Sequence, residues 1–189
     1  MGDPKKPKKK YEPPRFLWRP DVIQEELRLV GQYGLRNKRE LWKNRTMISK
    51  FRGIARALIG KIPEERGKME RELLGKLKKL GIIHETAVLD DVLDLTIEDI
   101  LERRLQTMVF QKGLANSLHQ ARQLVTHGHI SIGERRVTSP SYLVTRQDEN
   151  QVSYAPKSPL TNLEHPIRQM MKVVAKEEKT EETQNEGTK

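Results

Sequence analysis

The sequence predicts an α+β fold, in which a helical N-terminal region precedes a pair of helices and a small antiparallel sheet. Two observations carry this prediction. Apolar residues recur every three or four positions through most of residues 21–125, which is the period of an amphipathic helix. From residue 130 onward, apolar and polar residues alternate in short runs, which is typical of half-buried strands.

Both ends of the chain have a different composition. Residues 1–14 are mostly lysine and proline, and residues 172–189 contain no core-forming residue after Val174. Such segments bury too little apolar surface to offset the entropy lost on ordering. We therefore predict a disordered basic arm over 1–14, a helical region over 15–95, a two-helix domain with its sheet over 96–165, and a flexible tail over 166–189.

Three helices are expected in the N-terminal region. The first begins with Asp21 as N-cap after Pro20 and ends near Gly34. The second runs from about 38 to 58, and its predicted buried face consists of Leu41, Ile48, Phe51, Ala55 and Leu58. The third covers 64–80 and ends at Gly81, with a predicted buried face of Met69, Leu73, Leu77 and Leu80.

The second region begins with two further helices. Thr96 and Asp99 have the spacing of a capping box, and the apolar period that follows predicts one continuous helix up to Gly113. Ser117 and Gln120 repeat that spacing at the start of the next helix, which Gly128 ends.

Strands follow the second of these helices. Residues 130–132 and 135–137 predict a hairpin around the two-residue turn Gly133-Glu134. Further short strands are expected over 142–144 and 152–154, with a turn at 148–150 between them.

Charge is distributed unevenly along the chain. The formal net charge is +10, and residues 1–60 alone carry 16 basic and 6 acidic side chains. This asymmetry favours a polyanionic partner over a general role in solubility, which balanced charge would serve equally well. Arg45, Arg52 and Arg56 recur at helical spacing with few acids between them, so phosphate contact is favoured over a solvated helix face.

A second anion site is expected at the start of the helix after Ser117. The first turn of a helix presents unpaired N–H groups and the positive end of the helix dipole, and both attract a phosphate. Lys112 and Asn116 lie beside this turn, and His119 and Arg122 lie away from the apolar stripe of the helix.

Several function classes are disfavoured by the sequence. The absence of cysteine excludes disulfides and thiolate zinc sites, and no apolar run reaches the length of a membrane span. A secretory signal is not expected either, because no apolar stretch follows the basic N-terminus. A solvated helix face is the preferred interpretation of the acidic cluster at Asp90, Asp91 and Asp94, and the pair His127 and His129 has no third metal ligand nearby. We predict no catalytic residue, no metal, no cofactor and no small-molecule substrate.

Two segments resemble a known family. Residues 104–144 include the runs ARQLV (121–125), HGHI (127–130) and PSYLV (140–144), and they are similar to the RNA-binding domain named after small-subunit ribosomal protein four. The run QYGLRNKRELW (32–42) and the run LERRLQT (101–107) resemble the archaeal and eukaryotic branch of that family. The resemblance extends over roughly residues 14–160.

This resemblance implies a function and partners. It implies a structural, primary 16S rRNA-binding protein of the small ribosomal subunit, located in the cytoplasm, that nucleates assembly of the subunit body and contributes to translational accuracy. It also implies contact with ribosomal protein five and a functional link with protein twelve. The alternatives are a ribosome-assembly factor with the same module, an RNA-modifying enzyme, for which the chain leaves no room, and a protein at a membrane surface, which is not expected.

From the charge pattern, the helix start and the resemblance together, sixteen side chains are candidates for rRNA contact. They are Arg36, Lys38, Arg39, Arg45, Arg52, Arg56, Arg103, Arg104, Lys112, Asn116, Ser117, His119, Arg122, His127, Arg135 and Arg136.

Overall fold

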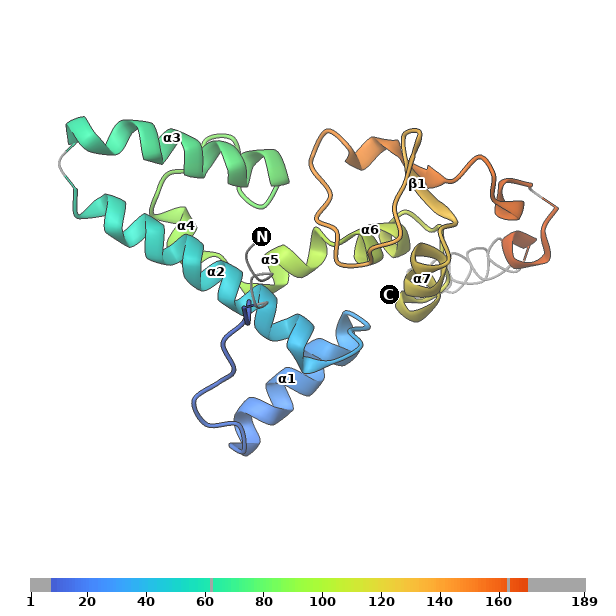
Figure 1. Cartoon of the computed structure of the whole chain (residues 1–189), viewed down its shortest axis with the longest axis horizontal. Helices are drawn as coiled ribbons and strands as arrows, with labels where there is room; N and C mark the ends of the chain where they lie inside the picture. Colours follow the sequence, from blue (N-terminus) through green and yellow to red (C-terminus); the bar gives the residue numbers. More distant parts are fainter. Residues whose placement is uncertain (1–7, 62, 163, 170–189) are drawn as a thin grey trace, which may run out of the picture. The chain divides into compact units, whose positions relative to one another are not determined.

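The computed structural model describes residues 8–61, 63–162 and 164–169. The chain forms two compact units, Met1–Leu101 and Glu102–Lys189, and the first is helical whereas the second combines helices with a small sheet (Figure 1). The predicted α+β class is therefore confirmed. Residues 1–7 of the predicted basic arm and residues 170–189 of the predicted tail lie outside the described residues.

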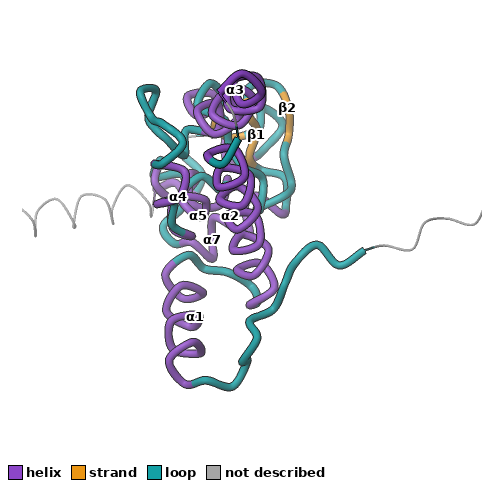
Figure 2. The backbone as a smooth tube through the Cα atoms, turned by 90° about the vertical axis from the view of Figure 1, so that its left-hand side faces the viewer, coloured by secondary structure: helices purple, strands orange, loops and turns teal. Residues whose placement is uncertain are grey.

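The first unit is built around one long helix. Its elements are α1 (Pro20–Gln32), α2 (Lys38–Ile59), α3 (Pro63–Leu80), α4 (Asp91–Asp94) and most of α5 (Ile97–Glu102). Helix α3 folds back along α2 (Figure 1), and α2 also packs against α1 and α4. A loop joins α1 to α2, as the tube in Figure 2 shows. The predicted buried face of α2 is confirmed at all five positions.

The predicted inner face of α3 is only partly correct. Leu73 and Leu77 are buried and Leu80 is half-buried, but Met69 is 51% exposed. Four residues turn a helix by about 40° more than one full turn. Two such steps place Met69 roughly 80° from Leu77, beyond the edge of the face that packs on α2.

The start of α1 also differs from the prediction. Pro20 is the first helical residue and Arg19 occupies the N-cap without a side-chain hydrogen bond, so Asp21 is not the cap. Proline is favoured at the first helical position because its missing N–H would have no partner there. Asp21 instead lies in the first turn, where its carboxylate stabilises the positive end of the helix dipole.

The single helix predicted before Gly113 is divided in two. Helix α5 ends at Glu102 and α6 (Leu105–Gln111) begins after Arg104, whose backbone is extended (φ −73°, ψ 142°). Arg104 forms an isolated antiparallel bridge with Leu143. Residues 142–144 are consequently not the separate strand that the sequence predicts.

Helix α7 (Leu118–Thr126) and a three-stranded antiparallel sheet complete the second unit. The strands β1 (Ile130–Ile132), β2 (Arg135–Arg136) and β3 (Val152–Tyr154) lie in the order β2-β1-β3. The predicted hairpin is confirmed, and Gly133 at its turn has φ +58°. A 3₁₀ helix, η1 (Glu149–Gln151), occupies the turn predicted before β3. Apolar residues from α6, α7 and the sheet form one core.

The exposed Met69 and the buried Leu77 provide a matched test of this packing on one helix. Leu77→Ala should lower the free energy of unfolding of the first unit by about 2–5 kcal/mol, because it leaves a cavity in the core. Met69→Ala should change it by less than about 0.5 kcal/mol. Urea denaturation of the full chain, followed by circular dichroism, measures both. Equal losses for the two variants would contradict the assigned face of α3.

Candidate nucleic-acid interface

The start of α7 has the cap that the sequence predicts. Ser117 is extended, and its Oγ accepts a hydrogen bond from the backbone N of Gln120 at 3.2 Å. The Gln120 side chain in turn accepts from the backbone N of Asn116 at 2.7 Å. The Ser117 hydroxyl is therefore committed to the cap, and an anion at this end would meet the exposed side chains of Asn116 and His119.

Arg122 is held between α6 and α7. Its Nη1 donates to Oε1 of Gln106 at 3.2 Å, and Nε2 of Gln106 donates to the carbonyl oxygen of Leu118 at 3.0 Å. Arg122 is half-buried, whereas Gln106 is buried. This arrangement fixes the direction of the Arg122 guanidinium, and the residue as a whole stays partly exposed.

Two other candidate cations converge on Glu149 in η1. Arg103 forms an ion pair with the Glu149 carboxylate at 2.9 Å, and Nζ of Lys112 donates to the Glu149 carbonyl oxygen. Arg104 is only 2% exposed. Burial leaves the Arg104 guanidinium no surface to offer to a polyanion, so Arg104 is not part of an interface with RNA.

A tyrosine positions the loop that precedes α7. The hydroxyl of Tyr154 in β3 donates to the carbonyl oxygen of Leu114 at 2.7 Å, and the Arg168 guanidinium lies 4.8 Å from the Tyr154 ring centroid. Burial raises the pKa of Tyr154, and the nearby Arg168 opposes that rise. The phenol consequently keeps its proton, and with it this hydrogen bond to the loop.

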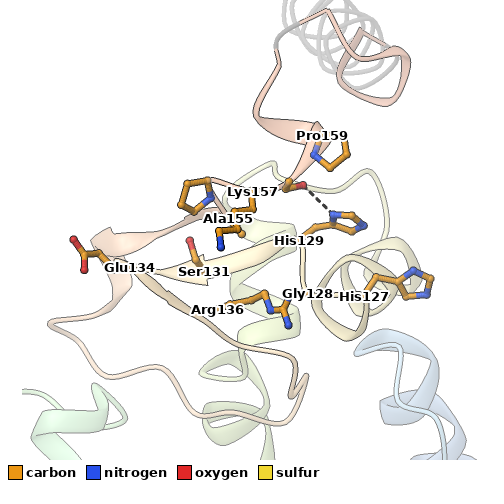
Figure 3. Close-up of a pocket in the computed structure, with 11 residues that line it drawn as sticks. His127, Gly128, His129, Ser131, Glu134, Arg136, Ala155, Lys157 and Pro159 are labelled. Atoms are coloured by element: carbon orange, nitrogen blue, oxygen red, sulfur yellow. Dashed lines mark hydrogen bonds between the residues drawn. The ribbon is translucent and has the colours of Figure 1, made fainter.

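The candidates from the end of α7 and from the hairpin lie at different places. His127 and Arg136 line a pocket together with residues that were not predicted, among them His129, Ser131 and Lys157 (Figure 3). Arg135 is exposed and does not line this pocket. Lys157 follows β3 and Ser131 belongs to β1, so only the pairing of these strands brings them together.

In the first unit, some candidate cations are exposed and others have protein partners. Arg36, Arg39, Arg45 and Arg56 are exposed. Lys38 lies 3.1 Å from the carboxylate of Glu26, which is buried and also accepts from Nε1 of Trp42 at 2.8 Å. Arg52 donates to the carbonyl oxygen of Leu95, and Nε of Arg56 donates to the carbonyl oxygen of Arg52 at 3.4 Å.

Neither a metal site nor a membrane span is found in the part of the chain that the structure describes. No three histidine, cysteine or acidic side chains there are grouped closely enough to hold an ion. In that acidic cluster, Asp91 accepts a hydrogen bond from the backbone N of Val88 at 2.7 Å. None of the described helices is both long and apolar enough to cross a bilayer.

Two helices, a three-stranded sheet and cations around a capped helix start define a small nucleic-acid-binding module. Residues 103–150 match the family model of the S4 domain. Small ribosomal subunit protein uS4 of Ignicoccus hospitalis is 55% identical over 159 residues, which cover 84% of this chain and 96% of that protein. The uS4 proteins of Hyperthermus butylicus and Saccharolobus solfataricus are each 53% identical, over 89% and 82% of this chain and 97% and 86% of their own lengths. The chain belongs to the uS4 family, in its archaeal branch.

The Ser117 cap can be tested independently of any ligand. Ser117→Ala should lower the free energy of unfolding of the second unit by about 1 kcal/mol, because the backbone N–H of Gln120 loses its hydrogen-bond acceptor. Ser141→Ala, at an exposed position outside any helix, should change it by less than about 0.5 kcal/mol. Thermal denaturation of both variants measures the difference. A Ser117 variant as stable as the wild type would show that the cap contributes nothing.

Proposed function

We propose that the chain is a structural protein of the small ribosomal subunit, located in the cytoplasm, and that it binds 16S rRNA as a primary binder. The observation that carries the proposal is the match to the S4 domain over residues 103–150, together with relatives that are named as small ribosomal subunit proteins. Those names denote ribosomal proteins rather than enzymes.

The charges of the described residues support a backbone-directed mode of binding. Six of the candidate arginines are exposed: Arg36, Arg39, Arg45, Arg56, Arg135 and Arg136. The guanidinium group suits the phosphate backbone because its planar fork donates two parallel hydrogen bonds. The deep major groove of A-form RNA is closed to side chains, so recognition of a folded RNA rests mainly on its shape and its phosphates.

The two units have distinct roles in this proposal. The helical region over 15–95 contributes arginines from α2 and the turn before it, and the domain over 96–165 contributes the start of α7 and the hairpin. Candidates with protein partners, such as Lys38 and Arg103, hold the fold in the free protein and offer only their remaining donors to RNA.

Finer aspects of the proposal follow from membership of the family. We infer that the protein nucleates assembly of the subunit body, contacts ribosomal protein five and acts together with protein twelve in translational accuracy. An assembly factor that uses the same module is the alternative. A structural constituent co-sediments with finished small subunits, whereas an assembly factor leaves them.

Binding to 16S rRNA should depend steeply on salt. Each phosphate contact releases counterions and contributes about 0.7–0.9 to the slope of log K against log salt concentration. Six exposed arginines therefore predict a slope of roughly −4 to −5 in a filter-binding titration. A slope between −1 and −2 would contradict an extended phosphate-binding surface.

Arg122→Ala should weaken binding to an rRNA fragment by about 1–3 kcal/mol, since a half-buried, oriented guanidinium makes strong hydrogen bonds to an anion. Arg71→Ala is the matched control, because it removes the same charge from α3, where Arg71 donates to the carbonyl oxygen of Gly67. An affinity for Arg122→Ala equal to that of the control would remove Arg122 from the interface.

A further inference from the structure

A pocket beside the sheet has features that the proposed phosphate-binding surface does not use. It lies where the end of α7, the hairpin and the loop after β3 meet, and its volume is about 470 Å³. Cavities of about 300–1,000 Å³ are the usual size for small-molecule sites. The whole pocket belongs to the second unit.

A buried hydroxyl in this pocket has no partner within the described part of the chain. Ser131 is 1% exposed, and its Oγ makes no hydrogen bond to any described residue. Buried polar groups in proteins are almost always paired, because an unpaired group loses its interaction with water and gains nothing in return. A ligand that enters the pocket can supply the missing partner.

Two cations lie at the entrance. Arg136 and Lys157 are both exposed, so they keep their charges in contact with solvent. The Arg136 side chain passes directly over Gly128, where an added Cβ would lie only 3.1 Å from Arg136 Cδ. Gly128 thus gives Arg136 room to reach the pocket, and its φ of +77° also favours glycine. Glu134 lies at the opposite end of the pocket from His127 (Figure 3), so an anion is directed toward Arg136.

Two imidazole rings line the same space. The ring centroids of His127 and His129 are 6.3 Å apart, with an angle of 30° between the ring planes. Nδ1 of His129 lies 2.9 Å from Oγ of Ser158, the contact that is dashed in Figure 3. The Ser158 Oγ also accepts a hydrogen bond from the backbone N of Leu160. The contact with Ser158 fixes the His129 ring. Histidine rings are among the side chains on which unstacked RNA bases stack.

The groups in this pocket complement the parts of a nucleotide: the two cations suit a phosphate, and the imidazole rings and the buried hydroxyl suit a base. We propose that this pocket binds one unpaired nucleotide of the RNA, with its phosphate at Arg136 and Lys157 and its base beside His129 and Ser131. The proposal rests on the proposed function, in which RNA is the partner, and adds a site at which the protein distinguishes an unpaired nucleotide from a helical phosphate backbone. A simple anion site would need neither the rings nor the hydroxyl.

Nucleoside 5′-monophosphates test the pocket without rRNA. The full chain is titrated with each of the four monophosphates, with the corresponding nucleosides and with inorganic phosphate, while NMR follows the imidazole signals, assigned with His127→Gln and His129→Gln. At least one monophosphate should shift both rings saturably and bind at least threefold more tightly than inorganic phosphate. Equal binding of inorganic phosphate, or no saturable shift, would overturn the proposal.

Two variants make the test specific. Ser131→Ala should weaken monophosphate binding about 3- to 10-fold and leave the melting temperature unchanged or raised, because an unpaired hydroxyl is removed from the free protein. Arg136→Ala should abolish the shift, whereas Arg146→Ala, with the same loss of charge at an exposed position of the same unit outside the pocket, should stay within twofold of wild type. A lower melting temperature for Ser131→Ala, an unchanged affinity, or equal losses for the two arginine variants would each overturn the proposal.

The outcome separates this inference from the proposed function. Wild-type chain that binds an rRNA fragment but no monophosphate leaves the proposed function standing and removes the nucleotide site. Chain that binds a monophosphate but no rRNA fragment removes the proposed function, and it leaves a nucleotide pocket whose ligand is not part of rRNA.

Discussion

Backbone hydrogen bonds between residues 103–106 and the segment 140–144 are the constraint on which the second unit depends. The backbone N of Leu105 donates to the Tyr142 carbonyl oxygen at 2.8 Å, and the backbone N of Val144 donates to the Arg103 carbonyl oxygen at 2.9 Å. A helix break leaves amides without intrahelical acceptors, and buried amides must be paired. The loop supplies those acceptors, so the break is stable only with the loop in place, and Val144 then closes the core.

The same constraint explains what the sequence predicts well and what it does not. The face of α2 and the Ser117 cap depend on local spacing, so both are readable from residues alone. The break at Arg104 cannot be predicted from the sequence, because Leu101 and Leu105 on either side of it keep the spacing of one continuous helix. Its cause lies some forty residues away, at Leu143. The pocket is hidden for the same reason, since Ser131 and Lys157 meet only through strand pairing.

Basic residues in this chain have two separate uses, which a net charge does not distinguish. Lys38 and Arg103 each pair with a glutamate, and Arg52 and Lys112 donate to backbone carbonyl oxygens. These contacts hold loops and helices together in the free protein. The arginines of α2 and the hairpin that are exposed lie instead at the surface, where we propose that they contact RNA. The sequence gives the number of basic side chains, but burial and pairing in the folded protein determine how many of them are available to a partner.

The two tryptophans of the chain occupy opposite environments within the first unit. Trp18 is 89% exposed, ahead of α1, whereas the Trp42 indole donates to the buried Glu26. Their fluorescence therefore carries two signals of different origin. Emission from Trp42 reports the packing of α1 on α2, because its hydrogen-bond partner Glu26 lies on α1. Quenching of Trp18 by a soluble collisional agent reports whether a partner covers the segment before α1. The native chain is thus its own optical probe, with no dye attached.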